Sequence, residues 1–272
     1  MAGTSDQVDV WLLLEYRPAW KAKALPASDL APATKDWLQR SVDAFAAQGL
    51  RARPQLIRQP ELDTDQVRLL VGHGEQLWEF TGTGYDFLQE LDLAGALAGA
   101  TAAAAGARLL REPRYFVCTN GQRDLCCARF GLPVYAALRE QVGERVWQAT
   151  HLGGHRFAPN VLVLPAGALY GRVGVAAVPD FVATVDGGGL AFDHLRGRSR
   201  YPKHVQAAEA LLAEDGLRLL HVDGDAARAT VTFAAADGRR QVQVARSDPE
   251  PALTSCGDAE PSETFIYQVS GA

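Results

Sequence analysis

The chain has few cysteines and no long hydrophobic run, and each shortage excludes a class of protein. Four cysteines among 272 residues are too few for the disulfide framework of a small secreted domain. The uncharged run at 93–107, LAGALAGATAAAAGA, falls short of the roughly 20 apolar residues that a membrane span needs. The first 16 residues carry acids before a short apolar run and no basic leader. We therefore expect a cytoplasmic protein with no membrane contact.

The chain also lacks the excess of positive charge that nucleic-acid binding requires. The formal net charge is −5, so nucleic acid is not an expected partner. The charge is nevertheless uneven, because residues 111–172 hold eight arginines against four acids, a net charge of +4. This basic stretch is where we look for a site.

Hydrophobic patterning predicts two successive units with the element order β-α-β-β-β-α of a thioredoxin-like fold. In the first unit we expect strands at 8–16, 53–59, 66–73 and 76–82, with helices at 33–50 and 85–99. In the second we expect strands at 114–119, 145–150, 160–167 and 168–174, with helices at 132–143 and 179–187. The rest contains a helix at 202–216 and strands at 217–224, 227–235 and 239–246. The predicted fold is therefore α/β (α+β), with domains at 1–107, 108–189 and 190–272.

Cysteine and histidine gather in the second unit. Cys118 ends a predicted strand, and Cys126 and Cys127 follow in a loop that we expect to be rich in turns. His151 and His155 stand after the next strand, separated by the pair Gly153-Gly154 that disfavours a helix. Two thiolates and two imidazoles make a set of four ligands for zinc or for a [2Fe–2S] cluster.

The spacing of the cysteines favours the cluster over zinc. Zinc fingers and ribbons take their cysteines from a tight turn, with two to four residues between them. Here eight or nine positions separate the first cysteine from the adjacent pair, which suits a larger object. Gly153 and Gly154 would let backbone N–H groups approach the inorganic sulfurs.

The segments CTNGQRDLCCARFGLP and HLGGHRFAPNVLVLPAGALYGRV resemble the sucrase/ferredoxin-like family over about residues 111–175. The resemblance implies a thioredoxin-like ferredoxin domain in which two cysteines and two histidines hold a [2Fe–2S] cluster. Carried over, the ligands are Cys118, Cys127, His151 and His155. Asn120 replaces a histidine that many members have, at a position that is not a ligand. No carboxylate pair supports the sucrase part of the family name.

The residues by themselves leave open whether Cys126 or Cys127 is the ligand. Members with one cysteine there place it nine positions after the first, which favours Cys127 and makes Cys126 a nearby thiol. Cys256 has no partner in the sequence, so it is a core cysteine or a redox partner of the site. The glycine run 186–190 lacks the context of a phosphate loop and is interpreted as a connector.

The expected function is one-electron transfer or redox sensing rather than conversion of a substrate. Histidine ligands raise a cluster's potential above that of all-cysteine clusters, and an exposed one could couple reduction to proton uptake. Arg123 has two possible roles. It forms a surface ion pair with Asp124 that holds the turn, or it offsets the negative charge of the reduced cluster. Together with Arg156 and Arg172, Arg123 would then steer an acidic electron-transfer protein to the site. The alternatives are a structural zinc module that mediates protein contacts and a thiol oxidoreductase that uses the adjacent cysteines.

Overall fold

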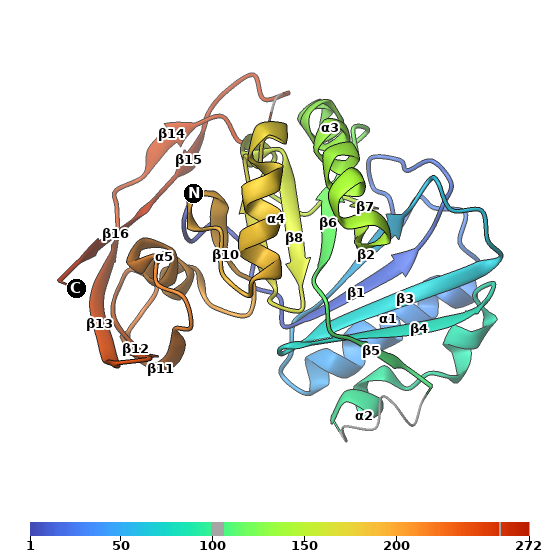
Figure 1. Ribbon diagram of the computed structural model, residues 1–272, viewed down its shortest axis with the longest axis horizontal. Coiled ribbons are helices and arrows are strands. Elements are labelled where there is room, and N and C mark those ends of the chain that lie inside the picture. Colours follow the sequence, from blue (N-terminus) through green and yellow to red (C-terminus); the bar gives the residue numbers. More distant parts are fainter. Residues whose placement is uncertain (99–105, 256, 272) are drawn as a thin grey trace.

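A computed structural model describes residues 1–98, 106–255 and 257–271 and contains one large mixed sheet. Its ten strands lie in the order β10-β9-β8-β6-β7-β2-β1-β3-β4-β5. A four-stranded sheet, β11-β12-β13-β16, and a two-stranded sheet, β14-β15, follow in the C-terminal part. Figure 1 shows the second half of the large sheet between the first half and this C-terminal part. Within the described residues, no helix combines the length and apolar character that crossing a membrane demands.

The two halves of the large sheet have the same pairing pattern. In the first half β1 is parallel to β2 and antiparallel to β3, and β4 joins β3 to β5. In the second half β6 is parallel to β7 and antiparallel to β8, and β9 joins β8 to β10. The halves meet where β2 pairs antiparallel with β7. The tandem thioredoxin-like arrangement predicted from the sequence is therefore confirmed, with a fifth strand in each half that patterning missed.

The elements have the following bounds. The first half contains β1 (Val10–Glu15), α1 (Pro32–Ala47), β2 (Ala52–Arg58), β3 (Gln66–His73), β4 (Gln76–Thr83), α2 (Leu93–Ala98) and β5 (Arg108–Leu110). The second contains β6 (Arg114–Cys118), α3 (Leu125–Val142), β7 (Val146–Ala149), β8 (Asn160–Leu164), β9 (Ala168–Gly171), α4 (Val178–Asp186) and β10 (Leu195–Arg198). The C-terminal part contains α5 (Lys203–Leu212), β11 (Arg218–Gly224), β12 (Arg228–Ala235), β13 (Gly238–Arg246), β14 (Glu250–Ala252), β15 (Ser262–Thr264) and β16 (Tyr267–Ser270).

Three segments differ from the predictions. The helix expected at 85–99 is a 3₁₀ turn, Asp86–Glu90, followed by the short α2, and residues 99–105 of the uncharged run lie outside the described part. Helix α3 begins at Leu125 rather than at 132 and runs through Pro133, because Asp124 caps its first turn. The division at 107 and 189 stays a prediction, but β5 and β10 extend the two halves of the sheet beyond those boundaries.

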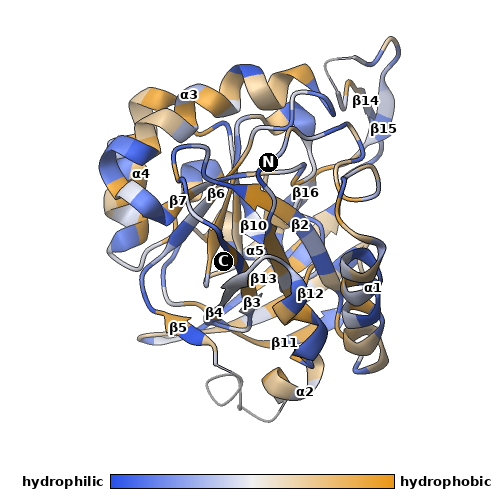
Figure 2. Cartoon of the chain, turned by 90° about the vertical axis from the view of Figure 1, so that its right-hand side faces the viewer, coloured by the Kyte–Doolittle hydropathy of each residue, from blue (hydrophilic) through white to orange (hydrophobic). Residues whose placement is uncertain are grey.

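Alternation along the strands gives the large sheet two buried faces. On one face, α1 packs on the first half and α3 and α4 pack on the second, as separate cores. On the other face both halves contribute to one shared core, which includes Trp11, Leu13, Ile57, Phe116, Trp147 and Leu162. Figure 2 shows hydrophobic residues on the inner strands and hydrophilic residues on the outer sides of α1 and α4. Cys118 and Cys127 belong to the shared core, so the first half supplies part of the wall behind them.

Candidate metal centre

Cys118 stands at the last position of β6, where its side chain turns toward the shared core. It is 1% exposed, and its strand neighbour two positions earlier, Phe116, faces the same core. Helix α3 passes close to this strand end at Gly131. A Cβ atom built on Gly131 would lie 2.2 Å from the carbonyl oxygen of Cys118. Glycine is therefore needed there for α3 to approach the strand.

Cys127 lies in the first turn of α3, which brings it back to Cys118. Asp124 precedes the helix and accepts a hydrogen bond from the Cys126 N–H at 2.9 Å, so its carboxylate serves as the N-cap. Cys127 is 1% exposed, whereas Cys126 is half-buried and disulfide-bonded, so it is not the nearby thiol that the sequence predicts. The turn-rich loop predicted for these cysteines is thus wrong, because the cap starts the helix before them.

The histidines lie on a loop that both halves of the sheet hold. Arg53 on β2 donates to the carbonyl oxygen of His151 at 3.2 Å. Gly153 and Gly154 have φ of +89° and +71°, and a 3₁₀ turn, His155–Phe157, follows. The backbone is left-handed at both positions, and this conformation favours glycine. The two histidines therefore do not share an α-helix, as the sequence predicts.

Sequence reasoning missed Arg196 on β10, which holds the same loop. Arg196 is 2% exposed and donates to the Gly153 carbonyl and to Asn160 Oδ1, each at 2.8 Å. A Cβ atom on Gly154 would lie 2.4 Å from its Nη2. The residue stands 41 positions beyond His155 in a short predicted connector, so no local pattern marked it.

The predicted ligands come together as two overlapping groups. Cys118, Cys127 and His151 place one donor atom each within 4.8 Å of one another, and Asp124, Cys127 and His155 do the same. The Cys127 Sγ lies 3.7 Å from the His155 Nδ1. The two imidazole rings stack at 3.9 Å between centroids with 10° between their planes. Cys127, shared by both groups, occupies the middle of the arrangement.

Local electrostatics prepare one thiol and one imidazole for metal binding. A hydrogen bond from the Cys127 thiol holds the pKa of Cys118 well below its usual range, helped by His151 and the Leu152 N–H. The same interaction, with burial, raises the pKa of Cys127. Burial and the neighbouring His151 lower the pKa of His155, which keeps its imidazole neutral. Thiolate and neutral imidazole are the forms that bind metals.

One buried atom indicates that a further group belongs here. The Nδ1 of His151 is buried and has no hydrogen-bond partner within the described part of the chain. Buried polar atoms are nearly always satisfied, and a metal ion would satisfy this one. Two soft thiols and two imidazoles also match the donor set of a mixed-ligand [2Fe–2S] cluster. The residues present therefore fit the group that the sequence resemblance implies.

The residues predicted to surround the ligands take different places. Asp124 is 6% exposed and its Oδ2 lies 3.5 Å from the His155 Nδ1, so its carboxylate faces the histidine loop rather than the surface. Ser255 of the C-terminal part donates a short hydrogen bond to the same carboxylate, a contact that the sequence did not indicate. Arg123 is exposed and Arg156 is half-buried. Cys256 lies outside the described residues.

Comparisons with known proteins bear on the same part of the chain. A profile of the sucrase/ferredoxin-like family matches residues 1–197. A solved structure titled as a thioredoxin-like [2Fe–2S] ferredoxin from Aquifex aeolicus is similar at 20% identity and a TM-score of 0.30, over 34% of this chain and 97% of its own. No curated protein matches. Because the profile spans most of the sequence and includes every predicted ligand, the chain belongs to the sucrase/ferredoxin-like family.

Proposed function

We propose that this protein binds a [2Fe–2S] cluster through Cys118, Cys127, His151 and His155 and transfers single electrons. The observation that carries the proposal is the position of Cys127 between two donor groups, one reaching Cys118 and the other His155. A single tetrahedral ion needs all four donors around one point. The four proposed ligands do not form one such group in the described residues, whereas a cluster with two irons bridged by inorganic sulfide needs only two of them at each metal position.

When bound, such a cluster supplies a one-electron couple whose potential rises as histidine replaces thiolate. The chain's own residues fix the ligands and exclude water from the cysteine side. Both ligand cysteines are 1% exposed, and the shared core packs behind them. His151 and His155 are half-buried, so the histidine side is nearer to solvent. Electrons would therefore enter and leave most easily on that side.

Asp124 acts as a positioning residue for His155. Its carboxylate is fixed at one end by the Cys126 N–H and faces the imidazole with the other oxygen. Carboxylates next to metal-bound histidines set the orientation and tautomer of the ring through the nitrogen that does not bind the metal. Asp124 faces Nδ1, so it would leave Nε2 as the ligand nitrogen of His155. We expect the same role here, with Asp124 holding His155 in the orientation that a ligand needs.

Metal content and colour test the proposal. Purified protein should be red-brown and contain two iron and two acid-labile sulfide per chain. Cys127→Ala should lose the visible absorption, while Cys126→Ala, the adjacent control, should keep it. A colourless protein with one zinc per chain would favour the zinc module instead, and retention of colour in Cys127→Ala would remove the ligand assignment.

The redox partner proposed from the charge pattern is an acidic protein. Arg123 is exposed next to the cysteine turn, and Leu125, 76% exposed, gives an apolar contact beside it. Electrostatic steering predicts that reduction by such a partner slows as salt rises, and more weakly so in Arg123→Gln. Rates independent of salt would contradict an acidic partner. Proton coupling through His151 or His155 stays a prediction, and a potential that does not change with pH would contradict it.

A further inference from the structure

Three arginine side chains surround one aromatic ring on the histidine side of the metal centre. The guanidinium carbons of Arg156, Arg196 and Arg172 lie 4.7, 4.9 and 5.8 Å from the centroid of the Phe157 ring. Phe157 itself follows His155 by two positions. In the described part of the chain, the ion pairs of arginine all involve other residues. Like charges are thus brought together with no direct ion pair to an acid among the described residues.

Arg172 reaches this position through an unfavourable backbone conformation. Its φ is +56°, in the left-handed region that is unfavourable for a non-glycine residue. Its N–H donates to the Phe157 carbonyl at 2.8 Å, which fixes the turn after β9 beside the ring. Glycine would be the residue of choice for the turn alone. A non-glycine residue in this conformation marks a candidate functional position.

Arg196 contributes a buried charge that neutral groups leave uncancelled. Its donors go to the hydroxyl and carbonyl of Thr4 as well as to Gly153 and Asn160, all of them uncharged acceptors. Asp6 offsets part of this charge but is itself paired with Arg53, and a buried charge with no directly bonded counter-charge is costly. An anion near Phe157 would offset part of that cost and would also relieve the repulsion between Arg156 and Arg172.

A cavity of small-molecule size opens beside this cluster. Its volume is about 450 Å³, and Arg156, Phe157 and Arg196 line it together with Lys203. Its acids are Asp6, already paired with Arg53 at 3.0 Å, and Glu263. The N-terminal residues 3–4 and the C-terminal residues 264–265 form its other walls. Pockets for small ligands are commonly about 300–1,000 Å³, so the space suits a small organic molecule.

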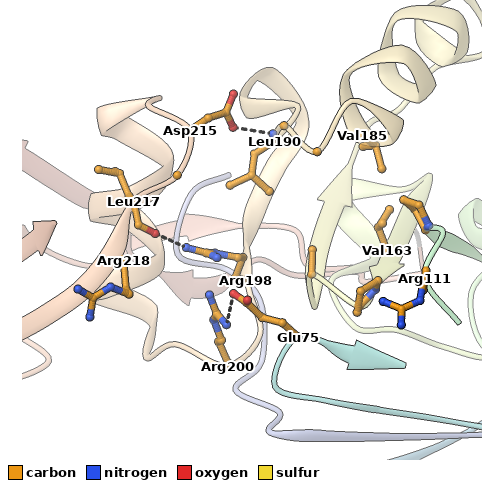
Figure 3. Close-up of a pocket in the computed structure, with 16 residues that line it drawn as sticks. Glu75, Arg111, Val163, Val185, Leu190, Arg198, Arg200, Asp215, Leu217 and Arg218 are labelled. Atoms are coloured by element: carbon orange, nitrogen blue, oxygen red, sulfur yellow. Dashed lines mark hydrogen bonds and ion pairs between the residues drawn. The ribbon is translucent and has the colours of Figure 1, made fainter. Parts of the chain in front are cut away.

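A second cavity contains arginines of both kinds, because Arg198 and Arg200 have acidic partners whereas Arg111 and Arg218 have none among the described residues. It has a volume of about 540 Å³ and lies between β8, β10, the end of α4 and the start of β11. There Arg198 is paired with Glu209, and Arg200 lies 3.1 Å from Glu75. Figure 3 shows Arg200 directed at Glu75 and Asp215 bonded to the backbone of Leu190. The arginines around Phe157 have no such partners in the described residues.

We propose that Arg156, with buried Arg196 behind it and exposed Arg172 on the Phe157 ring beside it, binds the carboxylate or phosphate group of a small organic anion in the cavity beside His155. The free guanidinium donors of Arg156 and Arg172 would take the oxyanion, and Phe157 would contact the apolar part. This ligand would lie next to a proposed ligand of the metal centre, on the side nearer to solvent. The binding site itself does not depend on the metal centre.

Isothermal titration with inorganic phosphate and with malonate tests the proposal, at constant ionic strength and with sodium chloride as the control titrant. The two probes separate phosphate from carboxylate recognition. We expect saturable binding of at least one probe. A charge-assisted hydrogen bond contributes about 1.5–3 kcal/mol, so loss of one arginine should weaken binding about tenfold or more.

Arg172→Gly is the decisive variant, because it removes the guanidinium and also relieves the backbone strain. It should unfold at the same temperature as the original chain or higher, yet lose binding. Arg129→Met is the matched control, since Arg129 also lies over a phenylalanine, 5.4 Å from the Phe130 ring. It should bind as the original chain does. Absence of binding by both probes, or unchanged binding in Arg172→Gly, would overturn the proposal whether or not the protein contains iron.

Discussion

The two halves of the large sheet share one topology but differ at the ends of equivalent strands. The last position of β6 is Cys118, which pairs with Ala149 on β7. The last position of β1 is Glu15, which pairs with Ile57 on β2, and Ile57 and Ala149 pair with each other. Glu15 is 1% exposed and lies 3.0 Å from Arg17, so an ion pair occupies the position at which the second half has a proposed ligand.

The difference indicates that the candidate metal centre depends on the connections between the strands and helices rather than on the strands themselves. After β6 a short turn leads at once to α3, and the β7–β8 connection carries both histidines. After β1 the chain runs from 16 to 31 before α1 begins, and the β2–β3 connection, 59–65, has neither cysteine nor histidine. Sites are usually built on such connections above a rigid scaffold. The first half supports the histidine loop of the second half, because Arg53 donates a hydrogen bond to the His151 carbonyl oxygen.

The largest effect should come from substitutions at the two strand ends. Cys118→Ala should remove the visible absorption and the bound iron, because no other thiol stands at the end of β6. Arg17→Met should keep both, although it leaves the buried Glu15 without its partner and lowers the free energy of unfolding by about 3 kcal/mol at most. Absorbance, iron content and urea unfolding measure these effects. Iron loss in Arg17→Met would contradict the separation of support and site.

Two glycines offer a second comparison between the halves. A Cβ on Gly131 meets the backbone oxygen of Cys118 at 2.2 Å, whereas one on Gly72 of β3 meets the Leu164 side chain at 2.8 Å. Overpacking costs about 1–3 kcal/mol, and a side chain can move where a backbone cannot. Gly131→Ala should therefore lower both the melting temperature and the iron content, and Gly72→Ala should change the melting temperature less and leave iron in place. Equal losses would show that the approach of α3 to β6 is not critical.

Arg53 tests whether the first half supports the site. Arg53→Met removes the hydrogen bond to the His151 carbonyl, about 1 kcal/mol, and should shorten the half-life of the visible absorption on warming. Arg40→Met is the control, since Arg40 on α1 bonds at 3.3 Å to an exposed glutamine and lies in no site. If both variants bleach at the same rate, the contact has no role in holding the loop.

The smallest effect concerns acid stability at the far end of the second half. Hydrogen bonds from Arg145 and Tyr115 hold the pKa of Asp186 below its ordinary value of about 3.9. A lowered carboxyl pKa stabilises the fold above the unfolded-state pKa, and this contribution is lost as pH falls through the folded-state pKa. The original chain should therefore exceed Asp186→Asn in unfolding free energy at neutral pH, by a difference that shrinks below about pH 4. A difference that is constant with pH would contradict this origin.

The sequence predicted much of the fold because both halves follow simple periodicities. Continuous apolar runs such as 10–14 and 161–164 mark strands buried on both faces, and these strands lie where predicted. The start of α3 was missed because Pro133 looked like a first-turn residue, whereas the cap at Asp124 decides the start. The short strands β5 and β10 were missed because three or four residues carry too little pattern.

Of the candidate site, the sequence could predict only the side chains that would donate to a metal. Cys118, Cys127, His151 and His155 stand out by residue type and spacing, so the sequence could bring them together. Arg196 and Ser255 approach them from distant parts of the chain, through tertiary contacts that no local spacing encodes. The shared core behind the cysteines likewise depends on the pairing of β2 with β7, which hydrophobic patterning does not specify.

Electron paramagnetic resonance of the dithionite-reduced protein tests the central claim most directly. Mixed cysteine and histidine ligation of a [2Fe–2S] cluster predicts a rhombic signal with the low average g value of Rieske-like centres. His151→Ala and His155→Ala should each change or abolish that signal. A signal typical of an all-cysteine cluster, unaltered in both variants, would contradict the account, as would a reduced protein with no iron signal.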